Sequence, residues 1–273
     1  MSGTLAVTST EFQIAARNRW VTISVVMMAL FALVLSAAGS APTGHLGADK
    51  LSITVASLTS LAVYLVPLVA LLMSFDAIAG EIERGTLPLA LAYPVSRSEI
   101  LAGKLLAHLA ILGIAVTVGY AIAAAVAFVL DSQAARGLPA LFRLLWTSLL
   151  LGSTFLGIGY AISAVARRPG TAAGAAIALW LVMIVLFDLA LLAAIVVDSG
   201  GTFTRTVFPW LLVANPADAF RLYNLSASEA TAAAGGIAGA ANSIPPAMAL
   251  ASLIMWPIVA FILANIAFRR VTP

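Results

Sequence analysis

Charged side chains are concentrated in one short stretch of an otherwise apolar chain. Residues 75–104 carry seven of them, whereas the flanking residues 53–74 and 105–130 carry no Asp, Glu, Lys or Arg. The seven are Asp76, Glu81, Glu83, Arg84, Arg97, Glu99 and Lys104. A helix that spans lipid does not tolerate such a cluster, so the stretch must lie outside the bilayer. We expect it to be where the chain contacts another protein.

A second candidate is Asp188, the one clearly ionisable side chain within an apolar stretch, residues 171–197. It lies about 6 Å beyond the centre of that stretch, because a helix rises about 1.5 Å per residue. A carboxylate in a membrane suggests a functional site. Asp188 could line a translocation path or bind a cation such as copper. It could equally be a structural residue, hydrogen-bonded across a helix bundle or protonated.

The sequence offers little evidence for a metal site. The chain has no cysteine, which excludes disulfides, thiolate metal sites and iron–sulfur clusters. His108 is interpreted as a hydrogen-bonded residue near a helix end, and His45, in an outer loop, is weaker still. The methionines could bind Cu(I). They lack an M-x-x-M pattern, however, and flexible core packing explains them: Met27, Met28, Met73, Met183, Met248 and Met255.

Composition identifies a membrane protein. The 273 residues are 62% hydrophobic and 9% charged, with a mean hydropathy of +1.09, whereas a soluble domain has about 25% charged residues. No long basic run accompanies the pI of about 9.6, which argues against nucleic-acid binding.

Six stretches are long and apolar enough to span a bilayer, which takes roughly 20 helical residues. They are residues 20–38, 53–74, 105–130, 144–166, 171–197 and 247–268. We therefore expect an all-α membrane protein, a single transmembrane domain over residues 1–273. Nine Lys and Arg residues flank the spans on the side of the termini and five on the other, so the positive-inside rule places both termini and residues 75–104 in the cytoplasm.

Two segments outside the spans have a predicted structure. Residues 10–20 are predicted to form a short interfacial helix, or alternatively the frayed start of the first span. Residues 198–246 form the long outer, periplasmic loop. Its aromatic segment predicts a re-entrant or surface helix that docks an external partner, or alternatively a lid on the membrane, before an Ala/Gly-rich linker. The predicted docking residues are Trp210, Asn215, Pro216, Phe220 and Arg221.

Residues 75–104 are punctuated like a small built structure. Helix is predicted to continue to Arg84 and to stop at Gly85, which favours the left-handed conformation. A short transverse helix should begin at residues 86–88 and end before Pro94. Ser96 and Glu99 fit a capping box that starts the next helix. The transverse helix bears Leu87, Leu89, Leu91 and Tyr93 and should dock in a groove on another protein.

This run, FDAIAGEIERGTLPLALAYPVSRSEILAGK, resembles the membrane subunit of ABC transporters of the ABC-2 permease superfamily. The matching positions are Asp76, Glu81, Glu83, Gly85, Thr86, Leu87, Pro94, Arg97, Gly103 and Lys104. A narrower resemblance is to permeases of the copper-linked ABC system that matures nitrous oxide reductase. It covers essentially the whole chain, and its supporting matches are LWLVMIVLFDLALL at 179–192, PWLLVANPADAFRLYNL at 209–225 and the terminal FRR.

The resemblance implies that the transverse helix is a coupling helix, seated in a separate ATPase subunit. The implied contact residues are Glu81, Glu83, Arg84, Gly85, Thr86, Leu87, Pro88, Leu89, Tyr93, Pro94 and Arg97. The chain has no G-x-x-x-x-G-K-[ST] motif, so it should be non-catalytic and bind no cofactor, with ATP and Mg²⁺ on the ATPase.

The resemblance also implies partners and a location. The partners are two ATPase copies, a second copy of this chain, a periplasmic repeat protein, a copper chaperone and membrane lipid; the location is a bacterial or archaeal cytoplasmic (inner) membrane. The expected cargo is copper or a sulfur species. Alternatives are export of a lipid or drug, force transmission to a periplasmic partner without transport, and ion-coupled secondary transport, which would usually require more intramembrane charges than Asp188.

Overall fold

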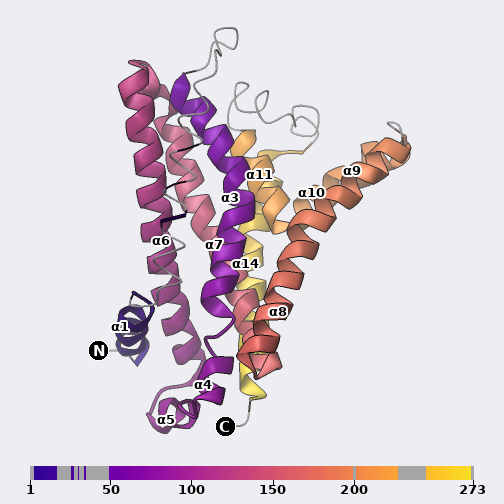
Figure 1. The fold of residues 1–273 in the computed structure, drawn as a ribbon. Coiled ribbons are helices and arrows are strands. Elements are labelled where there is room, and N and C mark those ends of the chain that lie inside the picture. Colours follow the sequence, from indigo (N-terminus) through magenta and orange to yellow (C-terminus); the bar gives the residue numbers. More distant parts are fainter. Residues whose placement is uncertain are drawn as a thin grey trace.

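The computed structural model describes residues 3–16, 26, 27, 30, 34, 49–198, 201–226 and 244–271. Helices joined by short turns make up this part of the chain, and no strand occurs among these residues (Figure 1). The predicted all-α class is therefore confirmed. In lipid, helices satisfy every backbone hydrogen bond internally, which is why an apolar chain of this kind adopts them.

Five helices among the described residues are long and apolar enough to cross a membrane. They are α3 (Lys50–Ser74), α6 (Arg97–Leu130), α7 (Leu138–Ala166), the continuous helix Pro169–Asp198 and α14 (Pro246–Arg269). Each includes one predicted span and extends beyond it, because hydropathy detects the lipid-facing part whereas capping groups set the ends. The predicted first span, residues 20–38, lies outside the described residues apart from positions 26, 27, 30 and 34.

Hydrogen bonds at the end of the bundle opposite the C-terminus illustrate how these helices begin (Figure 1). The Asp49 carboxylate accepts a hydrogen bond from the Ser52 amide at 3.0 Å and so caps α3. Asp131, which follows α6, accepts from the amides of Lys50 at 2.9 Å and Gln133 at 2.8 Å. These backbone hydrogen bonds hold the pKa of Asp131 below its usual value. The start of α3 and the end of α6 are thereby joined.

Helix α7 lies at the centre of the bundle and packs against α3, α6 and α14. Its largest fully buried side chains are Tyr160 and Phe155. Two buried side-chain hydrogen bonds connect it to α6: Tyr120 to Ser148 at 2.9 Å, and His108 Nδ1 to the Tyr160 hydroxyl at 2.8 Å. His108 is thus hydrogen-bonded within the bundle, in agreement with its predicted structural role. His45 lies outside the described residues.

The helix Pro169–Asp198 leans away from this bundle (Figure 1). It consists of α8 (Pro169–Trp180), the π-helical segment η2 (Leu181–Leu186) and α9 (Phe187–Asp198). Few of its apolar side chains are buried. A π-helical turn widens the backbone and frees it for other partners. Here the Asn215 side-chain amide donates to the Met183 carbonyl at 2.8 Å, inside the π segment.

After this helix the chain turns back into the bundle through η3 (Phe203–Val207), α10 (Phe208–Ala214) and α11 (Pro216–Leu225). Helix α11 packs against α3, α7 and α14, and its Phe220 and Leu222 are buried. This arrangement matches the re-entrant alternative. A surface helix or a lid would leave those side chains exposed, so the packing of α11 favours the re-entrant alternative. The predicted Ala/Gly-rich linker lies mostly outside the described residues.

The N-terminal helix α1 (Gly3–Ala16) begins seven residues before the predicted interfacial helix. It packs along α6, where a Cβ at Gly103 would lie only 2.6 Å from Val7 Cγ1. The glycine therefore allows the two backbones to approach closely. The prediction starts the helix at residue 10 because it relies on the charged residues that follow, and the contact with α6 leaves no local signal. Residues 17–20 lie outside the described part.

Candidate functional site

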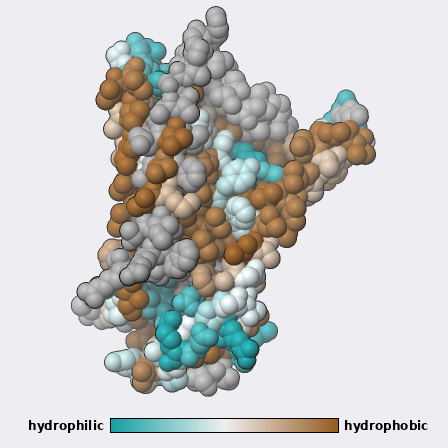
Figure 2. Space-filling model, in the orientation of Figure 1, coloured by the Kyte–Doolittle hydropathy of each residue, from teal (hydrophilic) through white to brown (hydrophobic). Residues whose placement is uncertain are grey.

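The segment between α3 and α6 protrudes at the end of the bundle that carries the C-terminus (Figure 1). It contains α4 (Ala79–Glu83) and α5 (Leu87–Ala92). The Ser163 hydroxyl of α7 accepts hydrogen bonds from the amides of Ile78 at 3.0 Å and Ala79 at 2.9 Å. These bonds fix the start of α4 to the central helix. In Figure 2, hydrophilic residues gather at this end, below the hydrophobic surface of the bundle.

Gly85 makes the sharp turn between α4 and α5, as predicted. Its φ is +67°, and no other atom lies within 4 Å of where a Cβ would stand. The requirement for glycine is thus conformational, since L-residues disfavour this region. The backbone closes behind it: Thr86 N donates to the Glu81 carbonyl at 2.9 Å.

Helix α5 has one anchoring side chain and two outward ones. Leu87 is fully buried against the bundle, whereas Leu89 is 66% and Tyr93 70% exposed. The prediction that Leu87 contacts a partner is therefore wrong, because this side chain secures α5 to the bundle. Pro88 lies in the first turn, where its missing N–H costs nothing.

The capping box at the start of α6 is confirmed. Ser96 N donates to Glu99 Oε2 at 2.8 Å, and Glu99 N donates to the Ser96 hydroxyl at 3.2 Å. Both ends of α5 are therefore defined locally, by a left-handed glycine before it and a capped helix after it.

Three helices meet at Lys104, whose side chain is only 3% exposed. Its ammonium lies 2.6 Å from Glu11 Oε1 of α1 and 2.6 Å from Glu81 Oε1 of α4. Among the described residues, Glu81 Oε2 is also buried and has no hydrogen-bond partner. The Glu81 carboxylate points inward to this ion pair, and its contact with the ATPase stays a prediction. A buried lysine requires such partners.

Arg97 also faces inward and binds the C-terminal end of the chain. Its Nη1 donates to the carbonyls of Phe268 at 2.6 Å and Val271 at 2.7 Å, and its guanidinium lies 5.4 Å from the centroid of the Phe268 ring. Arg97 thereby joins the start of α6 to the end of α14, and its role as a docking residue stays a prediction. No local signal could identify this contact, because the partners are more than 170 positions away.

The remaining predicted contact residues form one exposed face, which we call the coupling surface. Its members are Glu83, Arg84, Gly85, Thr86, Pro88, Leu89, Tyr93 and Pro94. Arg84 makes a 3.4 Å contact with the partly exposed Asp76 and is itself largely exposed. The surface therefore presents apolar and charged groups on a rigid base and can receive a complementary groove.

The structure places Asp188 in an ion-pair cluster. Arg221 Nη2 lies 2.9 Å from Asp188 Oδ2, and Arg221 Nη1 lies 3.2 Å from Asp218 Oδ1. These three residues line a pocket of about 280 Å³ between α9 and α11. Sequence reasoning misses the cluster because it assigns Arg221 to an external loop. The i, i+3 spacing of Asp218 and Arg221 is the available signal.

Most of the predicted periplasmic docking residues are in the interior. Asn215, Pro216 and Phe220 are buried, and Arg221 is occupied by the two carboxylates. Packing of α11 into the bundle draws them away from the surface of the chain, and their role in docking stays a prediction. Trp210 is exposed, and its role stays a prediction.

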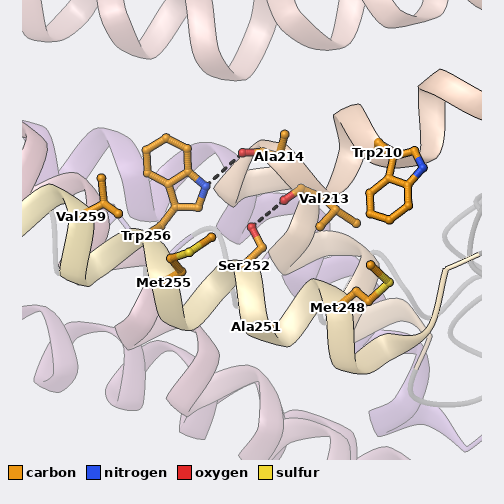
Figure 3. Close-up of a pocket in the computed structure, with 9 residues that line it drawn as sticks. All are labelled: Trp210, Val213, Ala214, Met248, Ala251, Ser252, Met255, Trp256 and Val259. Atoms are coloured by element: carbon orange, nitrogen blue, oxygen red, sulfur yellow. Dashed lines mark hydrogen bonds between the residues drawn. The ribbon is translucent and has the colours of Figure 1, made fainter.

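Trp210 borders an apolar pocket of about 520 Å³ between α10 and α14 (Figure 3). Two hydrogen bonds join its walls: Trp256 Nε1 donates to the Ala214 carbonyl at 3.0 Å, and the Ser252 hydroxyl to the Val213 carbonyl at 2.5 Å. They satisfy the last carbonyls of α10, which have no partner within that helix. The pocket can accept an apolar group.

The described residues contain no cluster of metal ligands. Across the described ranges, no three His, Asp or Glu side chains are grouped so as to hold an ion.

Comparison with known proteins gives consistent results. The family model described as ABC-2 family transporter protein matches residues 5–272. The chain is 45% identical over 258 residues to the probable ABC transporter permease protein NosY of Pseudomonas aeruginosa, which covers 93% of both chains. It is 40% identical over 264 residues to the protein of the same name from Stutzerimonas stutzeri, covering 95% of both.

Proposed function

The chain belongs to the ABC-2 family of transporter proteins and is a permease subunit of an ABC transporter, and from this we propose that its coupling surface seats in a separate ATPase. ATP and Mg²⁺ would then be bound by the ATPase alone. Closure of two ATPase copies would move α5 and, through α4 and α6, the membrane helices of two copies of this chain.

One observation carries the proposal: α5 is exposed on its outer side and fixed on its inner side. Leu89 and Tyr93 point outward, whereas Leu87 is buried and Lys104 joins α4, α6 and α1. A lever must have both properties, since a docking helix on a flexible loop would absorb the movement of its partner. The positive-inside distribution supports a cytoplasmic position of this end, in a bacterial inner membrane with both termini inside.

The narrower proposal concerns the pathway. The relatives named NosY and the resemblance at residues 179–192 and 209–225 support a role in copper or sulfur handling during nitrous oxide reductase maturation. A NosD-like periplasmic repeat protein and a copper chaperone would be the external partners. Metal and sulfur analysis of the purified complex tests this role, and a lipid or drug that stimulates ATP hydrolysis would replace it.

The docking proposal is tested by co-purification of the chain with its ATPase and by ATPase assay. Tyr93→Ala and Leu89→Asp should abolish assembly or coupled activity while the permease itself still folds. Phe142→Ala is the matched control, because Phe142 at the opposite end of the bundle is also 70% exposed. Assembly and activity retained in both α5 variants would overturn the assignment of α5 as the docking helix.

A further inference from the structure

The cluster of Asp188, Asp218 and Arg221 has an unbalanced charge. One guanidinium faces two carboxylates, so with all three groups ionised the cluster carries one net negative charge. The rest of the pocket wall is apolar and includes Leu191, Leu212 and other aliphatic side chains. An uncompensated charge in such surroundings is costly, since it loses hydration without gaining a partner.

The carboxylate of Asp218 is the group that lacks a partner in this cluster. Asp218 is only 3% exposed. Its Oδ1 accepts a hydrogen bond from Arg221 Nη1, but its Oδ2 is buried and has no hydrogen-bond donor among the described residues. The carboxylate of Asp188 is held by the same guanidinium and acts on Asp218 as a like charge. Two carboxylates can bond to each other only when a proton lies between them.

A proton fits this site better than a metal ion does. Calcium and magnesium require about six or more oxygen ligands, whereas the described part of the chain offers no third acidic or histidine side chain here. The Arg221 guanidinium also contacts both carboxylates, so its charge repels a second cation. We propose that Asp188 and Asp218 share one proton beside Arg221, forming a proton-binding site in the wall of the α9–α11 pocket.

The position of the two acids links the proton to a movement. Asp188 belongs to the outlying helix Pro169–Asp198, whereas Asp218 and Arg221 belong to α11, which is packed into the bundle. Among the described residues, Tyr64 of α3 is a further titratable side chain that acts on Arg221. Separation of α9 from α11 would part the acids, leave each ionised and release the proton. Opening of the pocket is therefore coupled to proton release.

The site can be tested on the full-length chain purified without an ATPase, independently of the proposed function. Infrared difference spectra on hydrogen–deuterium exchange at neutral pH should show the carbonyl band of a protonated carboxylic acid. Asp218→Asn and Asp188→Asn should each lose one such acid per chain, because the remaining carboxylate pairs with Arg221. Asp131→Asn, at a partly exposed position outside the pocket, should lose none. An unchanged band in a folded Asp218 or Asp188 variant, or no band in the wild type, would overturn the site.

A second experiment, which tests the coupling to pocket opening, rests on the proposed function. In the complex, trapping the ATPase with vanadate should release one proton per permease chain into a weakly buffered medium, and none in Asp218→Asn. If no proton is released on vanadate trapping while the infrared spectra show the protonated acid, the coupling to pocket opening is rejected and the proton site is retained. If Tyr93→Ala fails to uncouple the ATPase, the function of α5 is wrong, and the infrared assignment is unaffected.

Discussion

Arg97 and Phe268 are joined by two interactions of different kinds. The guanidinium donates a 2.6 Å hydrogen bond to the Phe268 carbonyl and lies over the Phe268 ring at 5.4 Å from its centroid. Arg97 is the first residue of α6, directly after the coupling segment, and Phe268 is in the last turn of α14. The last membrane helix is therefore attached to the base of the coupling segment.

Replacement of Arg97 should loosen this attachment. Arg97→Ala removes two hydrogen bonds from a charged donor and a cation–π contact, and we expect a loss of about 1.5–3 kcal/mol of stability. Arg97→Lys should recover part of it, since an ammonium cannot reproduce the planar guanidinium geometry. Thermal unfolding of the purified chain measures both variants. Equal stability of wild type and Arg97→Ala would show that the contact does not hold α14.

Lys104 should be required for stability only while Glu11 and Glu81 are present beside it. Lys104→Ala leaves the buried carboxylates of Glu11 and Glu81 without a cation, so we expect a loss of about 3–5 kcal/mol. The triple variant Lys104→Met, Glu11→Gln, Glu81→Gln removes all three charges and should restore most of that stability. Denaturation midpoints of the two variants decide the point. A triple variant no more stable than Lys104→Ala would argue against charge as the cause.

Gly85→Ala tests the left-handed turn. Because no neighbour lies within 4 Å of the added Cβ, the cost should be purely conformational, about 1–2 kcal/mol. Gly85→Asn should be tolerated better, since asparagine adopts positive φ more readily. Stability and ATPase binding should fall together in the alanine variant. If Gly85→Ala is as stable as Gly85→Asn, backbone strain is not the reason for glycine at this turn.

The pH dependence of Asp131 follows from its backbone hydrogen bonds. They lower its pKa in the folded state, so the ionised carboxylate stabilises the fold above the unfolded pKa of about 3.9. This contribution is lost as the pH falls through the lower folded value. Wild type should therefore unfold at a higher temperature than Asp131→Asn at neutral pH, and the difference should vanish in acid. A difference that grows on acidification would have the wrong sign.

Local signals in the sequence predicted what depends on neighbouring residues. The five membrane helices described here, the turn at Gly85 and the capping box at Ser96 each rest on a few adjacent positions, and each is present. The inward orientation of Glu81 and the pairing of Asp188 with Arg221 depend instead on residues of other helices. Hydropathy and spacing contain no information on such contacts, because packing in three dimensions decides them.

The position of α11 has a consequence for how the protein is made. Its binding groove is formed by α3 and α7, which are synthesised before it, and by α14, which is synthesised after it. When residues 216–225 leave the ribosome, one wall of their site does not yet exist. Asp218, Arg221 and Asn224 therefore lack part of their packing surface until the final span is inserted. The bundle can therefore close around α11 only after α14 has been synthesised, in the last stage of translation.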